Sequence, residues 1–144
     1  MGEESIEKRE CVRFKIPGAT VTYKRDKTLL KKDEMSEFCP VIDISRGGVR
    51  FLTHELIKFE TKLLVEIHVP GEKIPLSLKG TVRWFSPNPS KSYKYQIGVQ
   101  FHTYGEKKDQ NYPGNLVKII ALEQKFMDES TAVDNESDKS EFSI

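Results

Sequence analysis

Six short segments of the chain alternate apolar and polar residues with a period of two, the pattern of a strand that buries one face. They are residues 19–23, 41–45, 49–52, 61–69, 76–84 and 95–101. In the last three, the apolar side chains expected to face a core are Leu63, Val65, Ile67, Val69, Leu76, Leu78, Val82, Trp84, Tyr95, Ile97, Val99 and Phe101. Turn-forming pairs such as Pro70-Gly71 separate the segments, and no helix is expected between them. The pattern predicts a mainly β protein, an antiparallel barrel or sandwich, and at this size a six-stranded barrel can close and remove its exposed edges.

Two segments depart from the alternation. Residues 28–38, TLLKKDEMSEF, are short and charged and are expected to form a long loop or a single helical turn. From Asn115 to about Met127, apolar residues recur at helical spacing after the start signals Pro113-Gly114. This predicts one C-terminal amphipathic helix over about 115–127, which packs across an open end of the barrel or, alternatively, binds a partner.

The formal net charge of +1 over 144 residues conceals an uneven distribution. Residues 1–127 contain 22 Lys and Arg against 16 Asp and Glu, a net charge of +6, whereas residues 128–144 contain 1 against 6, a net charge of −5. We expect a flexible N-terminus over 1–6, a single domain over 7–127, and an acidic, disordered tail over 128–144. The positive excess on the domain favours an anionic partner.

Enzyme, metal and membrane signals are weak. His54, His68 and His102 lack metalloprotease spacing, and the nucleophile-elbow, phosphate-loop and dinucleotide motifs do not occur. His68 and His102 are expected on polar strand faces as solvated side chains. Cys11 and Cys39 lie far apart and indicate neither a disulfide nor a zinc site. No apolar run approaches the ~20 residues that cross a bilayer, and the acidic N-terminus is unlike a signal peptide, so we expect a cytoplasmic protein that is not an enzyme and needs no cofactor or metal.

Two clusters combine charged groups with hydroxyls or glycines. Arg9 and Arg13, in KRECVR, are four residues apart and lie on one side of either an extended or a helical segment. Guanidinium groups form paired hydrogen bonds with phosphate or with O6 and N7 of guanine, and they stack on purines. In DISRGGVRF, Asp43 can accept N–H donors of a base edge, Ser45 can reach phosphate, and the glycines allow a close approach. Taken singly, the first cluster is also typical of a solvated face and the second of an Asx turn.

In this order, the clusters resemble the two motifs of the PilZ domain, the bacterial receptor for the second messenger cyclic di-GMP. The family pattern RxxxR matches residues 9–13, and [D/N]xSxxG matches residues 43–48. The likeness continues through GVRF, LKGTVRW and YQIGVQF and covers roughly residues 7–127. The resemblance implies a six-stranded antiparallel PilZ-type β-barrel with a C-terminal α-helix.

The resemblance also implies roles for individual residues. Arg9 and Arg13 are expected to bind the phosphates and guanine Hoogsteen edges of cyclic di-GMP. Asp43, Ser45 and Gly48 are expected to hold the ligand from the strand side.

Further residues are implicated less directly, namely Lys8, Gly47 and Trp84. In the family, a basic residue at the position of Lys8 often accompanies an intercalated ligand dimer, and whether the ligand binds as a monomer or a dimer stays open. Trp84 could flank a guanine or be a half-buried barrel residue. Arg46 and Arg50 add positive charge, and no direct ligand contact is expected from them.

The implied mechanism is a switch without chemistry, in which the phosphates draw in and order the N-terminal loop and a new surface is exposed to a protein partner. The resemblance implies an adaptor like the stand-alone members of the family, which act on motility, pilus assembly, exopolysaccharide synthesis or kinases. The sequence does not indicate which of these systems this protein acts on. Two alternatives remain. One is a ligand-independent PilZ-like interaction module; the other is a small basic β-barrel that binds single-stranded nucleic acid, disfavoured because exposed aromatics are not clustered on one strand face. A hydrolase is a distant third, because no nucleophile and base can be assigned.

Overall fold

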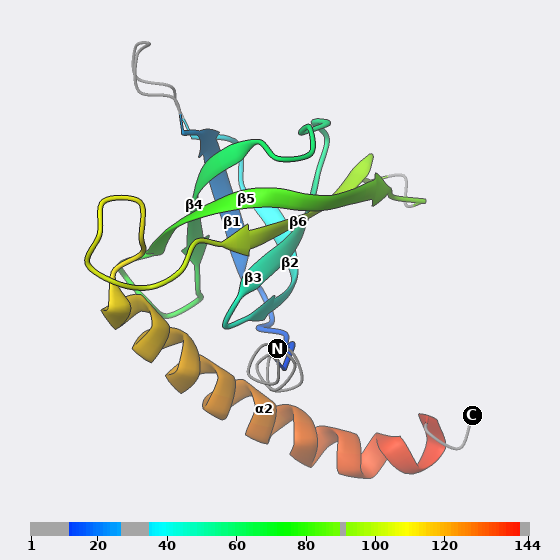
Figure 1. The fold of residues 1–144 in the computed structure, drawn as a ribbon. Coiled ribbons are helices and arrows are strands. Elements are labelled where there is room, and N and C mark those ends of the chain that lie inside the picture. The colour runs from blue at the N-terminus through cyan, green and yellow to red at the C-terminus, as the bar shows by residue number, and fades with distance from the viewer. Residues whose placement is uncertain (1–11, 27–34, 90–91, 142–144) are drawn as a thin grey trace, which may run out of the picture.

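The computed structural model describes residues 12–26, 35–89 and 92–141, with side chains described as far as Met127. Within these residues, six antiparallel strands form a closed barrel: β1 Thr20–Arg25, β2 Cys39–Ser45, β3 Gly48–Thr53, β4 Lys62–His68, β5 Leu76–Pro87 and β6 Tyr95–Phe101. Their order is β1-β2-β3-β6-β5-β4, and pairing of β1 with β4 closes the barrel (Figure 1). The predicted fold class and strand positions are therefore confirmed. Lys8, Arg9, Cys11, the predicted flexible N-terminus and most of the 28–38 loop lie outside the described residues.

The core consists of alternate strand residues, as the period of two predicts. On β4, Leu63, Val65 and Ile67 are completely buried. The other fully buried side chains of the described chain are Val21, Ile44, Val49, Phe51, Ile57, Leu78, Val82, Ile97 and Ile119. These buried side chains form one contiguous cluster. Burial of each stabilises the fold by about 1.5–3 kcal/mol, and a shift of strand register would lose this burial.

The alternation fails at Trp84, which was predicted to face the core and is instead 40% exposed. The pairing of β5 with β6 shifts register between Val82 and Trp84, so that two residues of β5 oppose one residue of β6. This bulge reverses the phase of the alternation beyond Val82 and turns the indole outward. Gly98 of β6 provides the space, since an added Cβ there would lie 3.2 Å from Cε3 of Trp84.

The C-terminal helix α2, Pro113–Glu141, begins earlier and ends later than predicted. Its backbone is helical over residues 128–141, where a disordered tail was expected and the helix was expected to end near Met127. Residues 128–141 contain neither Gly nor Pro to interrupt the helix. Figure 1 shows the second half of α2 continuing past the barrel. No helix in the described part of the chain is both long and apolar enough to span a membrane.

Helix α2 is attached to the barrel through one buried residue, Ile119, with Leu122, Phe126 and Met127 partly buried against the core. Two polar contacts fix its position. Asn115 donates to the carbonyl of Ser77 (2.9 Å), and Arg46, in the turn between β2 and β3, donates to Glu123 through Nε (2.9 Å) and Nη2 (3.3 Å). The helix is thereby connected directly to the β2–β3 turn.

Truncation of Ile119 to valine is expected to lower the free energy of unfolding by about 1 kcal/mol, because it removes one buried methylene from a close-packed site. Val117, on the same helix but 66% exposed, provides the matched control. We expect Val117→Ala to change stability by no more than about 0.5 kcal/mol in the same urea titration. Equal effects of the two substitutions would contradict the described packing of α2.

Candidate functional site

The N-terminal segment from Val12 onward runs beside β2 and brings Arg13 of the first sequence cluster to Asp43 of the second. Phe14 and Ile44 exchange backbone hydrogen bonds of 2.8 and 2.9 Å, forming an isolated antiparallel bridge. Phe14 and Ile16 are both buried and anchor the segment. The bridge places Arg13 beside Asp43, although thirty positions separate them in the sequence. The second arginine of the first motif therefore lies beside the first residue of the second motif.

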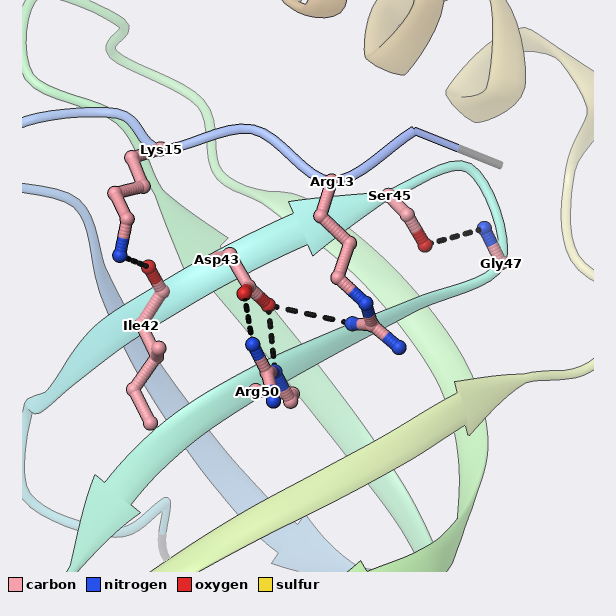
Figure 2. Close-up of polar contacts among 7 residues, drawn as sticks. All are labelled: Arg13, Lys15, Ile42, Asp43, Ser45, Gly47 and Arg50. Atoms are coloured by element: carbon pink, nitrogen blue, oxygen red, sulfur yellow. Dashed lines mark hydrogen bonds and ion pairs between the residues drawn. The ribbon is translucent and has the colours of Figure 1, made fainter. Parts of the chain in front are cut away.

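Asp43 is the centre of an ion-pair network (Figure 2). Its carboxylate is only 6% exposed, and Oδ1 accepts from Nε of Arg50 at 2.9 Å and from Nη1 of Arg13 at 3.3 Å. Nη2 of Arg50 donates to the other carboxylate oxygen. The Arg13 side chain is 54% exposed, so Asp43 orients it at the surface while its remaining donors face solvent.

The pKa of Asp43 reflects a competition between burial and positive charge. Burial acts to raise it, but the hydrogen bonds and charge of Arg50, together with the charges of Arg13 and Lys15, outweigh burial and lower the pKa below its ordinary value. The carboxylate is therefore ionised at neutral pH and keeps its capacity to accept N–H donors.

Replacement of Asp43 by asparagine is expected to destabilise the protein by about 1–3 kcal/mol at neutral pH, because charge-assisted hydrogen bonds to Arg50 are lost. Since the folded-state pKa is lowered, this contribution is complete above the ordinary aspartate pKa of about 3.9 and disappears as pH falls through the folded-state value. Urea titrations of both proteins between neutral and acidic pH should show the difference shrinking towards low pH. The exposed Asp26→Asn serves as control. A difference for Asp43→Asn that did not vary with pH would contradict the sign of the shift.

The turn between β2 and β3 contains the hydroxyl and glycine residues of the second motif. Ser45 is buried, and its Oγ accepts from the backbone N–H of Gly47 at 3.2 Å. Gly48 pairs with Gln100 on β6, and an added Cβ on Gly48 would overlap the carbonyl oxygen of Val99. Only glycine therefore allows β6 to approach the start of β3 this closely.

A surface depression of about 430 Å³ adjoins the turn. Its lining residues come from the N-terminal segment and from the second half of the barrel: Arg13, Ser45, Gly47, Gly48, Val49, Arg50, Arg83, Trp84, Gly98, Val99 and Gln100. Three of them are arginines and none is acidic. The guanidinium carbon of Arg50 lies 5.9 Å from the centre of the Trp84 ring, a cation–π arrangement that extends the cationic surface over an aromatic face. The volume is that of a small-ligand site, and its charge suits an anion with planar rings.

Most predicted site residues that can be examined lie at this depression. Arg13, Ser45, Gly47, Gly48 and Trp84 line it, and Asp43 adjoins it through Arg13 and Arg50. Lys8 and Arg9 lie outside the described residues.

Arg50 was underestimated from the sequence. It had been expected only to add positive charge, yet it forms the closest contacts with Asp43 and lines the depression. The antiparallel register Ser45↔Gly48, Ile44↔Val49, Asp43↔Arg50 explains its position. Counting outwards from the predicted tight turn would have placed Arg50 opposite Asp43, so the signal was present in the spacing.

Other polar residues have structural partners. His68 and His102, predicted to be solvated, are instead hydrogen-bonded to Thr22 (3.0 Å) and Thr81 (3.1 Å), and each is only partly exposed. Cys39 is buried as a free thiol, and burial raises its pKa. Among the described residues, no group of three His, Cys, Asp or Glu side chains is arranged to hold a metal ion.

This small closed β-barrel carries an arginine-lined surface depression whose charge suits an anionic ligand. The family model of the PilZ domain matches residues 7–117, so the chain belongs to the PilZ domain family. Among solved structures it is similar to the Bacillus subtilis inhibitor of motility (MotI/DgrA), with a TM-score of 0.60 and 16% sequence identity. The likeness covers 86% of this chain and 52% of that one, so this chain spans about half of its length. At this identity the likeness supports the fold. No curated protein sequence matches.

Proposed function

We propose that this protein is a receptor for cyclic di-GMP that acts as an adaptor rather than an enzyme. The observation that carries the proposal is the meeting of Arg13 with Asp43 at the edge of a depression that contains the Ser45–Gly48 turn. Both family motifs are complete in the sequence, and the second arginine of the first motif adjoins the first residue of the second motif. A ligand with two phosphates and two guanines offers acceptors for the arginines and N–H donors for the carboxylate.

In this proposal, Arg13 binds the phosphate or guanine Hoogsteen edge from the N-terminal segment. The β2–β3 turn holds the ligand from the barrel side. Asp43 accepts a guanine N–H, Ser45 binds phosphate, and Gly48 leaves room for close approach. Arg9, four positions before Arg13, supplies the second guanidinium, and Lys8 adjoins it.

Trp84 and Arg50 form the remaining wall. The indole is exposed and offers a flat surface on which a guanine stacks, and Arg50 is positioned between that ring and Asp43. Gly47, at the turn, exposes backbone to the same depression.

The proposed output is a change in protein interaction with an effector protein in the cytoplasm. The ligand orders the segment that carries Arg9 and Arg13, which costs conformational entropy and is driven by the charge-assisted hydrogen bonds. Arg46 gives the turn a direct contact with helix α2 through Glu123, so a shift of the turn reaches a second surface. The effector belongs to a motility, pilus, exopolysaccharide or kinase system.

Isothermal titration calorimetry with cyclic di-GMP, with GTP as the control ligand, tests the proposal. Saturable heat with cyclic di-GMP and little with GTP is the expected result, with one or two ligands per chain distinguishing a monomeric from an intercalated ligand. Absence of heat at several temperatures would overturn it and favour the ligand-independent module. Binding of a labelled single-stranded oligonucleotide that weakens steeply with salt would instead favour the nucleic-acid alternative.

A further inference from the structure

The bulge in β5 places two consecutive side chains on the outer surface of the barrel. In a regular strand, neighbouring side chains point to opposite faces, but Arg83 and Trp84 are both exposed. The pair Val82↔Val99 is followed directly by Trp84↔Gly98, so Arg83 is the extra residue of the bulge. Both side chains line the depression. The bulge therefore sets a guanidinium group next to an exposed aromatic ring.

Gln100 connects Arg83 to the second motif. On β6, Gln100 pairs with Gly48 of β3 on one side and with Thr81 of β5 on the other. Its side-chain oxygen Oε1 accepts from Nε of Arg83 at 2.9 Å. Gln100, Gly48 and Arg83 all line the depression. Arg83 is thus held on the wall of the depression that faces the motif across β6.

The hydrogen bond through Nε leaves the two terminal amino groups of Arg83 for a ligand. Nη1 lies 3.6 Å from Oε2 of Glu60, beyond ordinary hydrogen-bond distance. The two side chains are 49% and 63% exposed, so solvent screens their attraction. Arg13 and Arg50, in contrast, both donate to the buried carboxylate of Asp43. Of the arginines that line the described part of the depression, Arg83 is therefore the one least committed to a carboxylate.

We propose that Arg83 recognises the guanine that stacks on Trp84, by donating from its two terminal amino groups to O6 and N7. Gln100 is a positioning residue that holds the guanidinium for this contact. The inference rests on the proposed binding of cyclic di-GMP, whose two guanines allow this contact beside those proposed for Arg13. Guanine presents two acceptors on this edge, whereas adenine presents an amino group in place of O6. Arg83 thereby makes the site select guanine over adenine.

The 7-deaza analogue of cyclic di-GMP, in which a C–H group replaces N7 of each guanine, tests the proposal. Isothermal titration calorimetry of the full-length chain gives the dissociation constants of both ligands, and the analogue-to-ligand ratio measures the contribution of N7. Arg83→Ala removes the donor, and Gln100→Leu removes the acceptor that positions it. Glu60→Gln is the matched control, because it removes the ion pair and keeps Arg83 with Gln100. Circular dichroism verifies that each variant is folded.

Arg83→Ala is expected to weaken cyclic di-GMP binding by about tenfold or more and to lower the ratio by at least about threefold, since the analogue has already lost one of the two acceptors. Gln100→Leu should cause a smaller change of the same kind, and no further loss when it is combined with Arg83→Ala. Glu60→Gln should keep both affinities within about twofold of wild type.

An unchanged ratio in Arg83→Ala would overturn the inference, because a phosphate contact or a general effect of charge weakens both ligands equally. Wild-type affinity of that variant for cyclic di-GMP would also overturn it, as would additive losses in the chain with both Arg83→Ala and Gln100→Leu. Failure of the wild-type chain to bind cyclic di-GMP would overturn the proposed function itself, and this inference with it. The wild-type titration therefore distinguishes the two failures.

Discussion

Replacement of Arg13 by alanine is expected to weaken cyclic di-GMP binding by about 100-fold or more while leaving the barrel folded. A guanidinium that makes two charge-assisted hydrogen bonds to a phosphate or guanine contributes about 1.5–3 kcal/mol for each. The loss of stability should stay within about 1 kcal/mol, because the Arg13 side chain is 54% exposed and its ion pair with Asp43 is screened by solvent. Affinity and stability are therefore expected to separate in this variant.

Arg25 provides the matched control for this experiment. It also forms an ion pair with a carboxylate, 2.9 Å from Glu55, and its side chain is 37% exposed, but it does not line the depression. Calorimetric titration of Arg25→Ala should give wild-type affinity, and thermal unfolding should show both variants folded. If Arg13→Ala bound cyclic di-GMP as tightly as Arg25→Ala, the ligand would have to lie elsewhere.

Replacement of Gly48 by valine is expected to cost about 3 kcal/mol or more of unfolding free energy and to abolish ligand binding. The new Cβ would overlap the backbone carbonyl of Val99, and a backbone atom in a paired strand cannot move aside as a side chain can. Relief of the clash requires separation of β3 from β6 beside the second motif. A steep loss in thermal or urea stability, with no cyclic di-GMP heat, is the expected measurement.

Gly98→Ala is the comparison that isolates the backbone clash. Its added Cβ would meet the half-exposed Trp84 side chain at 3.2 Å, and that ring can shift by a few tenths of an ångström. We expect its stability loss to be at most about half that of Gly48→Val. Similar losses in the two variants would mean that the addition of a side chain at a strand glycine, rather than the backbone clash at Gly48, sets the loss of stability.

The strands and the second motif were predictable because their signals are local. Period-two alternation positions each side chain relative to its own neighbours, so 61–69 and 95–101 could be assigned without knowledge of their partners. The same local logic could have placed Arg50 opposite Asp43, by counting the register outwards from the Ser45–Gly48 turn. The role of Arg50 was missed because the register was not counted.

The prediction for Trp84 went wrong because a local rule met a nonlocal constraint. Trp84 obeys the alternation of β5 only up to the bulge, which depends on how β5 pairs with β6.

The sequence by itself determined the six strands, the C-terminal helix and the two motifs, since side-chain periodicity and turn chemistry act over a few residues. Only the tertiary structure brought Arg13 to Asp43, which required the Phe14–Ile44 bridge. It also made the arginine-lined depression, whose walls come from segments far apart in the chain. Such juxtapositions depend on barrel closure and helix docking, which are set by the summed burial of the core and cannot be read from any single stretch of residues.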